Sequence, residues 1–289
     1  MLIIENDNLI VYINPFGAEL SKIYNKKTNL NYLWNGNPNY WEGQAPILFP
    51  IIGKLKKDYI IINGNKFKLP KHGFARDSTF TVSKKEATKV VLELHNSKTT
   101  YINYPYLFCL QVSYELIENT LSVTHKVINK DTKEMYFSLG GHPAFNCPLT
   151  NKTNFEDYYL EFEKEEQATL FLINMDTGLC SGETKKIKLT KNLHLNYNLF
   201  ERDALIFENL QSKKISLKSN KHNFNISMTI DNWKYLAFWT KKDAPFICFE
   251  PWEGLPDFDN SNQDFSNKIG VRKLNAKKTF SNSYVLELQ

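Results

Sequence analysis

The chain has 289 residues, of which 42% are hydrophobic and 23% charged, and this balance excludes a largely disordered chain or a fibre. The net charge of +5 comes with scattered lysines and no block of like charges, so no nucleic-acid-binding arm is expected. No apolar run reaches the roughly 18 residues of a membrane span, and the first residues lack the pattern of a signal peptide. We therefore expect a cytoplasmic protein that binds neither nucleic acid nor membrane.

Period-two alternation of apolar and polar residues predicts short β-strands along the chain. The first clear hairpin has strand-like runs at 59–62 and 66–69, separated by the turn sequence Asn63-Gly64-Asn65. The same alternation predicts strands at 90–94, 121–128 and 224–230, and turn residues stand at 118–120 and 219–221.

Helical signals are scarce, since no segment of twelve or more residues keeps a 3.6-residue period. Many short strands without βαβ alternation indicate an all-β fold, either an antiparallel sandwich or a barrel. Two stacked sheets are needed, because one sheet with this many strands would leave apolar side chains in water. No Gly/Ser/Pro-rich linker divides the chain, so we expect a single domain over residues 1–289.

Three segments interrupt the strand pattern, at 71–77, 140–146 and 249–254. Each places an ionisable residue beside glycine or proline and an aromatic residue. Strand ends and loops of this kind present side chains to clefts. The four cysteines are far apart and form no Cys-x-x-Cys pair, so the sequence predicts no metal site.

A strand is predicted at 134–139, and it leads into Gly140-Gly141, which permit an unusual backbone path. His142 stands between these glycines and Pro143, which fixes the exit. A histidine held this rigidly is suited to presenting a ring nitrogen to a ligand. The alternative is a histidine that only forms a hydrogen bond across a tight turn.

Glu250 follows the predicted strand 246–249 and by alternation shares a face with Phe246 and Cys248. A carboxylate in apolar surroundings is costly unless it is paired or its pKa rises. We expect the strand to end at Pro251-Trp252, with Trp252 forming one wall of a pocket. An ordinary solvated glutamate is the alternative, and Glu253 is a rival for the same role.

His72, Arg76 and Asp203 are further candidates. Arg76 could instead form a weak surface ion pair with Asp77, and Asp203 could be a turn residue. The chain lacks a Gly-x-Ser-x-Gly elbow, a phosphate-binding P-loop and a His-Glu-x-x-His motif. A histidine and a glutamate in an aromatic-rich β-scaffold suit acid–base chemistry on a neutral polyol without metal or cofactor.

Three motifs, KHGFARD (71–77), GGHPAFNCP (140–148) and FEPWEG (249–254), in this order and at these separations, resemble those of the aldose 1-epimerase (galactose mutarotase-like) superfamily. The similarity extends over most of the chain and is greatest to a bacterial branch associated with lactose and other sugar operons. The resemblance implies a large antiparallel β-supersandwich with the sugar site on a concave sheet face.

The resemblance also implies residue roles. His142 matches the general acid that protonates the ring oxygen, and Glu250 matches the general base for the anomeric hydroxyl. His72 and Asp203 match sugar-binding residues, and Arg76 belongs to the loop signature. Lys54 is a departure, because relatives carry a substrate-binding arginine there and lysine lacks the planar fork for two parallel hydrogen bonds.

The expected function is mutarotation of an aldose by a monomer or homodimer. One alternative is a mutarotase for hexose phosphates in which Lys54 or Arg76 meets the phosphate. A second is a catalytically silent sugar-binding protein, and a third, less favoured, is a polysaccharide lyase on a similar sandwich.

Overall fold

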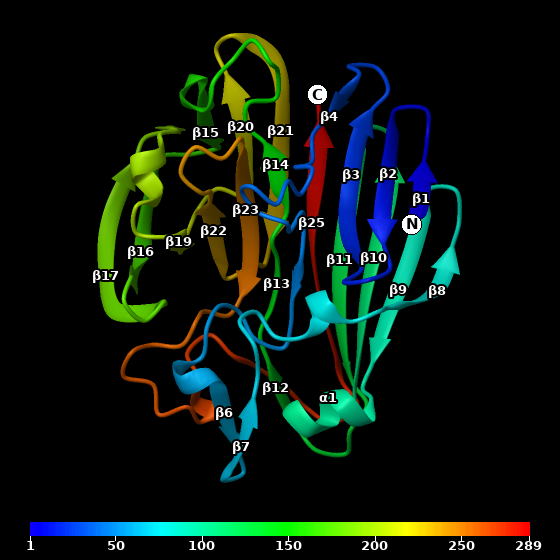
Figure 1. Cartoon of the computed structure of the whole chain (residues 1–289), viewed down its shortest axis with the longest axis vertical. Helices are drawn as coiled ribbons and strands as arrows, with labels where there is room; N and C mark the ends of the chain where they lie inside the picture. Colours follow the sequence, from blue (N-terminus) through cyan, green and yellow to red (C-terminus); the bar gives the residue numbers. More distant parts are fainter.

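Antiparallel β-sheets account for nearly all of the regular secondary structure in the computed structural model, which describes all residues 1–289 (Figure 1). The nine-stranded sheet has, in spatial order, β18 (Asn192–His194), β15 (Tyr158–Phe162), β20 (Lys214–Ser219), β21 (His222–Asp231), β25 (Thr279–Leu288), β11 (Thr120–Asn129), β10 (Phe108–Ile117), β9 (Lys89–His95) and β8 (Thr81–Lys85). The eight-stranded sheet has β17 (Leu179–Leu189), β16 (Glu166–Asn174), β19 (Leu205–Glu208), β22 (Tyr235–Trp239), β23 (Phe246–Glu253), β13 (Leu139–Gly141) and β5 (Ile47–Leu48), with β14 (Ala144–Asn146) also paired to β23.

Smaller elements flank these two sheets. A four-stranded sheet contains β1 (Leu2–Glu5), β2 (Leu9–Asn14), β3 (Glu19–Asn25) and β4 (Leu30–Asn31), and two-stranded ladders join β6 (Tyr59–Ile62) to β7 (Asn65–Lys68) and β12 (Met135–Phe137) to β24 (Arg272–Leu274). Short 3₁₀ turns occur at Lys56–Asp58, Ala75–Asp77, Phe155–Asp157, Tyr197–Phe200 and Phe265–Asn267. The one α-helix is α1 (Lys98–Asn103), and no helix has the length and hydropathy that a membrane crossing requires.

The all-β antiparallel sandwich predicted from the sequence is therefore confirmed. Alternation works as expected in β11, where every second residue is buried, including Leu121, Val123, His125 and Val127. The predicted turn between β6 and β7 is present, with positive φ at Asn63 and Gly64 as a two-residue hairpin loop needs.

A contiguous hydrophobic core lies against both large sheets and the four-stranded sheet. Val123 of β11, Phe249 of β23 and Val11 of β2 all belong to it. The core thus fixes how the sheets face each other, and the eight-stranded sheet keeps its other face for the site described below.

Two predicted strands have different limits. The strand expected at 134–139 is interrupted at Ser138, which separates β12 from β13. β23 does not end before Pro251 and Trp252 but continues to Glu253, because its partners β13 and β22 pair with it beyond the proline. Proline removes only one ladder donor, so pairing can resume on either side.

Candidate active site

A cavity of about 230 Å³ lies on the eight-stranded sheet, with walls from β16, β19, β22 and β23 and from loops around residues 41, 53, 71–76, 178 and 203. All but one of the residues predicted to form the site contribute to these walls. They are His72, Arg76, His142, Asp203, Glu250 and Trp252.

His142 and Glu250 meet because of strand register. β13 pairs Gly140 with Trp252 of β23, and β14 pairs Ala144 with Cys248 of β23. Continuing either register by two residues brings His142 opposite Glu250, and directly opposed residues of an antiparallel pair share one face of the sheet. In Figure 1 β13 lies beside β23 near the centre of the molecule.

The His142 Nε2 and Glu250 Oε2 atoms are 3.1 Å apart, although their alignment is not that of a hydrogen bond. Both side chains are buried, with exposed fractions of 9% and 1%. Burial lowers the pKa of His142 to about 3, and the positive charges of Arg76 and Lys71 act in the same direction. Burial also raises the pKa of Glu250 well above its usual range, assisted by the nearby carboxylate of Asp203. The cavity therefore favours the uncharged forms of both groups.

Aromatic rings surround the pair. The ring of His142 is 4.8 Å from that of Trp41 and 5.7 Å from that of Trp239. Trp252 forms a third indole wall, and a Cβ added to Gly140 would come within 2.7 Å of it. Gly140 was expected to give the backbone an unusual path, but it lies in β13 without a positive φ. Its role is instead to leave room for Trp252.

His72 enters the cavity from the loop before the 3₁₀ turn Ala75–Asp77. It has a φ of +68°, a strained conformation for a residue other than glycine. The backbone N–H of Gly53 donates to its Nδ1 at 3.1 Å. Burial, and then the neighbouring His142, keep the pKa of His72 well below its usual value. A neutral ring that accepts at Nδ1 carries its proton on Nε2, so His72 is a hydrogen-bond donor.

Arg76 and Asp203 add opposite charges to the cavity wall. The guanidinium Nε of Arg76 is 3.9 Å from Asp77, a loose contact that leaves its other donors free. Asp203 stands in a turn with a φ of +67° and its backbone N–H donates to the carbonyl of Phe200 at 3.1 Å. The turn interpretation of Asp203 and its place in the cavity therefore both hold.

Among the wall residues that were not predicted, three have an aromatic or charged side chain: Trp41, Lys71 and Trp239. Lys71 could have been predicted from the sequence, because it is the first residue of the KHGFARD motif and directly precedes His72. Trp41 lies in a loop and Trp239 at the end of β22, and only the fold brings their rings next to that of His142.

Lys54 is the predicted site residue that does not line the cavity. Its ammonium donates to the carbonyl of Thr177 at 3.0 Å, and its side chain lies beside Gly178, which does contribute to the wall. Lys54 thus braces the β16–β17 turn. Glu253, the rival carboxylate, does not line the cavity either. It accepts a hydrogen bond from the guanidinium of Arg272 at 2.5 Å.

Several polar atoms of the site are buried without a partner: His142 Nδ1, Glu250 Oε2 and Trp252 Nε1. An unpaired buried polar atom costs roughly 1–3 kcal/mol, and a ligand rich in hydroxyl groups could both donate to and accept from this set. A thiol completes the neighbourhood, since donor atoms of His142, Cys248 and Glu250 lie within 4.8 Å of one another. Burial raises the pKa of the Cys248 thiol well above its usual range, so burial favours the protonated form of this sulfur.

Comparison with known proteins assigns the chain to a family. The family model for aldose 1-epimerase matches residues 1–271. The chain belongs to the aldose 1-epimerase family. Two proteins of Lactococcus lactis subsp. lactis named LacX, one plasmid and one chromosomal, are each 34% identical to it over 290 residues, covering 97% of this chain and 97% of theirs.

Solved structures give the same result. A galactose mutarotase-like protein from Lactobacillus casei is 34% identical, covers the full length of both chains and superposes with a TM-score of 0.94. A galactose mutarotase related enzyme from Lactobacillus acidophilus is 29% identical, with a TM-score of 0.96 over 100% of this chain and 97% of that chain. The resemblance inferred from the three motifs is confirmed, and membership of the aldose 1-epimerase family supports a mutarotase-type function.

Proposed function

We propose that the protein is a mutarotase that interconverts the α and β anomers of a free aldohexose. The observation that carries the proposal is the buried His142–Glu250 contact of 3.1 Å in a cavity with unpaired polar atoms and three indole rings. Mutarotation needs one group that removes a proton and one that supplies a proton, and these two side chains are suited to that pair of roles.

In the proposed mechanism Glu250 accepts the proton of the C1 hydroxyl while His142 donates a proton to the ring oxygen O5. The C1–O5 bond breaks and leaves an open-chain aldehyde. Rotation about C1–C2 presents the other face of the carbonyl group. The reverse proton transfers then close the ring as the opposite anomer, and both residues return to their starting protonation states.

The pair holds the right number of protons for this cycle. Before a sugar binds, burial favours neutral His142 and protonated Glu250. The ion pair of imidazolium and carboxylate contains the same number of protons, differing only in where one of them lies. Hydrogen bonds from sugar hydroxyls to the carboxylate stabilise its charged form. Sugar binding therefore favours the protonation state that the mechanism requires.

The remaining wall residues provide sugar contacts in this proposal. His72 donates from Nε2, Arg76 donates from its guanidinium, and Asp203 accepts from hydroxyl groups. Trp252 covers an apolar C–H face of the sugar with its indole ring, which has an apolar body and one N–H donor. No metal or cofactor takes part in the proposed steps.

The test is anomer exchange measured by NMR on equilibrated glucose and galactose. The enzyme should raise the exchange rate above its value in buffer, and His142→Gln should remove most of the increase. A silent sugar-binding protein would instead bind sugar and leave the exchange rate unchanged, and that result would refute catalysis.

A hexose phosphate is the second candidate substrate, favoured by the presence of both Lys71 and Arg76 in the cavity wall. Their charges reach the site, because both lower the pKa of His142. If the phosphate is the substrate, kcat/KM for a hexose 6-phosphate should exceed that for the free sugar. Arg76→Ala should then lower kcat/KM for the phosphate much more than kcat/KM for the free sugar, and so remove this preference.

A further inference from the structure

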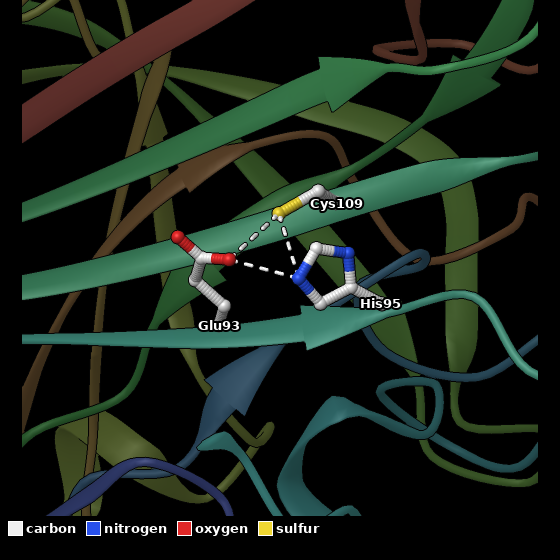
Figure 2. A group of neighbouring side chains, drawn as sticks. All are labelled: Glu93, His95 and Cys109. Carbon is white, nitrogen blue, oxygen red and sulfur yellow. Dashed lines mark hydrogen bonds and ion pairs between the residues drawn. The ribbon is translucent and has the colours of Figure 1, made fainter. Parts of the chain in front are cut away.

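A second group of chemically distinctive side chains lies on the nine-stranded sheet, at the β9–β10 ladder. Glu93 and His95 come from β9, two residues apart and on one face, and Cys109 comes from the neighbouring strand β10 (Figure 2). Strand register pairs His95 with Cys109 and Glu93 with Gln111. None of these residues lines the sugar cavity.

The three donor atoms converge on one point. Glu93 Oε2 lies 2.8 Å from His95 Nε2, and the Sγ of Cys109 lies 3.9 Å from each of them. Zinc bond lengths of about 2.0–2.3 Å in a tetrahedron imply donor separations of roughly 3.3–3.6 Å. The observed triangle differs from this by about half an ångström a side, which small side-chain rotations can supply.

The surroundings also suit a metal ion. Gln111 donates to Glu93 Oε1 at 2.7 Å, which fixes the carboxylate with its other oxygen toward His95 and Cys109. Such outer contacts orient metal ligands and strengthen binding. The side chain of His95 is 53% exposed, so an ion can enter from solvent, whereas Cys109 is buried beneath it.

We propose that Glu93, His95 and Cys109 bind one zinc ion on the outer face of the nine-stranded sheet, with water in the fourth position. Thiolate, imidazole and carboxylate donors form the ligand set that zinc prefers. On binding, the Cys109 thiol loses its proton to solvent and a sulfur–zinc bond forms, with no change of oxidation state. The ion joins β9 to β10 at a distance from the sugar cavity, so its role is to stabilise the sheet.

The experiment uses the full chain after treatment with EDTA, titrated with Co²⁺ alone and, separately, with Zn²⁺ alone. We expect one Co²⁺ per chain, with a thiolate-to-cobalt charge-transfer band and the visible bands of a tetrahedral ion. Added Zn²⁺ should displace the cobalt and raise the melting temperature. Sugar turnover should be the same with and without metal.

Variants locate the site. Cys109→Ser should remove the charge-transfer band, and exposed His95→Ala, which places no demand on the core, should weaken Co²⁺ binding at least tenfold. Gln111→Leu should weaken binding about 10–100-fold, while Cys248→Ser should keep the band. Absence of stoichiometric binding, or a band that survives Cys109→Ser and disappears in Cys248→Ser, would overturn the proposal.

Discussion

Replacing Glu250 with glutamine is the sharpest test of the proposed chemistry. Glutamine keeps the size of the side chain but cannot accept and release a proton. Because Glu250 is 1% exposed and touches the ring of His142, the amide should stay in the same place. Sugar binding should survive, and only the proton transfer should be lost.

The expected magnitude follows from the role of the group. A positioned general base contributes about 10²–10⁴-fold to a rate, so Glu250→Gln should lower kcat by that factor, or roughly 3–5 kcal/mol in activation free energy. Stability should change in the opposite sense, because the free energy of unfolding of Glu250→Gln should rise relative to the wild type as the pH increases. Burial raises the pKa of Glu250, so folding of the wild type becomes less favourable as the pH rises from 4.5 through the raised value. Glutamine cannot ionise, so the variant should gain in relative stability over that range.

Glu253→Gln is the matched control. It makes the same chemical change three residues further along β23, on a buried side chain that contacts Arg272 and the backbone of Lys234. This variant should lose stability to urea but keep kcat per folded molecule. Anomer exchange by NMR, with the folded fraction from circular dichroism, measures both variants. Near-native turnover in Glu250→Gln, or a collapse of turnover only in Glu253→Gln, would refute the assignment.

Three further measurements test the structure. The pH–rate profile should be bell-shaped. We expect kcat/KM to fall on the acid side as His142 gains a second proton, near its lowered pKa of about 3, and on the alkaline side as Glu250 loses its proton above 4.5. A maximum confined to pH 4.5–6.5 would show instead that Glu250 titrates below His142. Burial lowers the pKa of His125 to about 4, so the unfolded chain binds its proton first and stability is lost as the pH falls from 6.5 to 4. The wild type should lose about 3 kcal/mol more than His125→Phe between pH 7 and pH 4 in urea titrations, and equal losses would show that His125 is not buried as neutral imidazole. Gly140→Ala should raise KM more than it lowers kcat, because its methyl group displaces Trp252 from the cavity wall; unchanged kinetics would show that Trp252 does not need this space.

Local patterns were sufficient for the fold class. Alternation predicted the buried face of β11, and the turn residues predicted the β6–β7 and β10–β11 hairpins. They were not sufficient for strand limits. Ser138 breaks a predicted strand and Pro251 fails to end another, because pairing with neighbouring strands decides where a ladder stops.

The sequence predicted only part of the candidate site, because contacts between distant parts of the chain place the other residues. His72, His142 and Glu250 stand in motifs that combine an ionisable residue with glycine or proline and an aromatic residue, and all three line one cavity. Lys54 was predicted to face the sugar, but its ammonium is held by Thr177, 123 residues further along the chain. Trp239 reaches His142 only through the pairing of β22 with β23. Contacts of this range leave no trace in a local pattern.

The two motifs Gly-Gly-His-Pro and Phe-Glu-Pro-Trp can be understood as one structural unit. Each has proline directly after its ionisable residue, and the two residues are opposed across the gap between β13 and β14. Neither Pro143 nor Pro251 has an N–H that can donate to the ladder, so regular strand pairing is interrupted beside His142 and Glu250. The N–H of Phe249 still donates to the carbonyl of Pro143 at 3.0 Å. Since a slip of one residue would turn His142 or Glu250 to the other face of the sheet, the ladder on both sides of the gap keeps the imidazole and the carboxylate together.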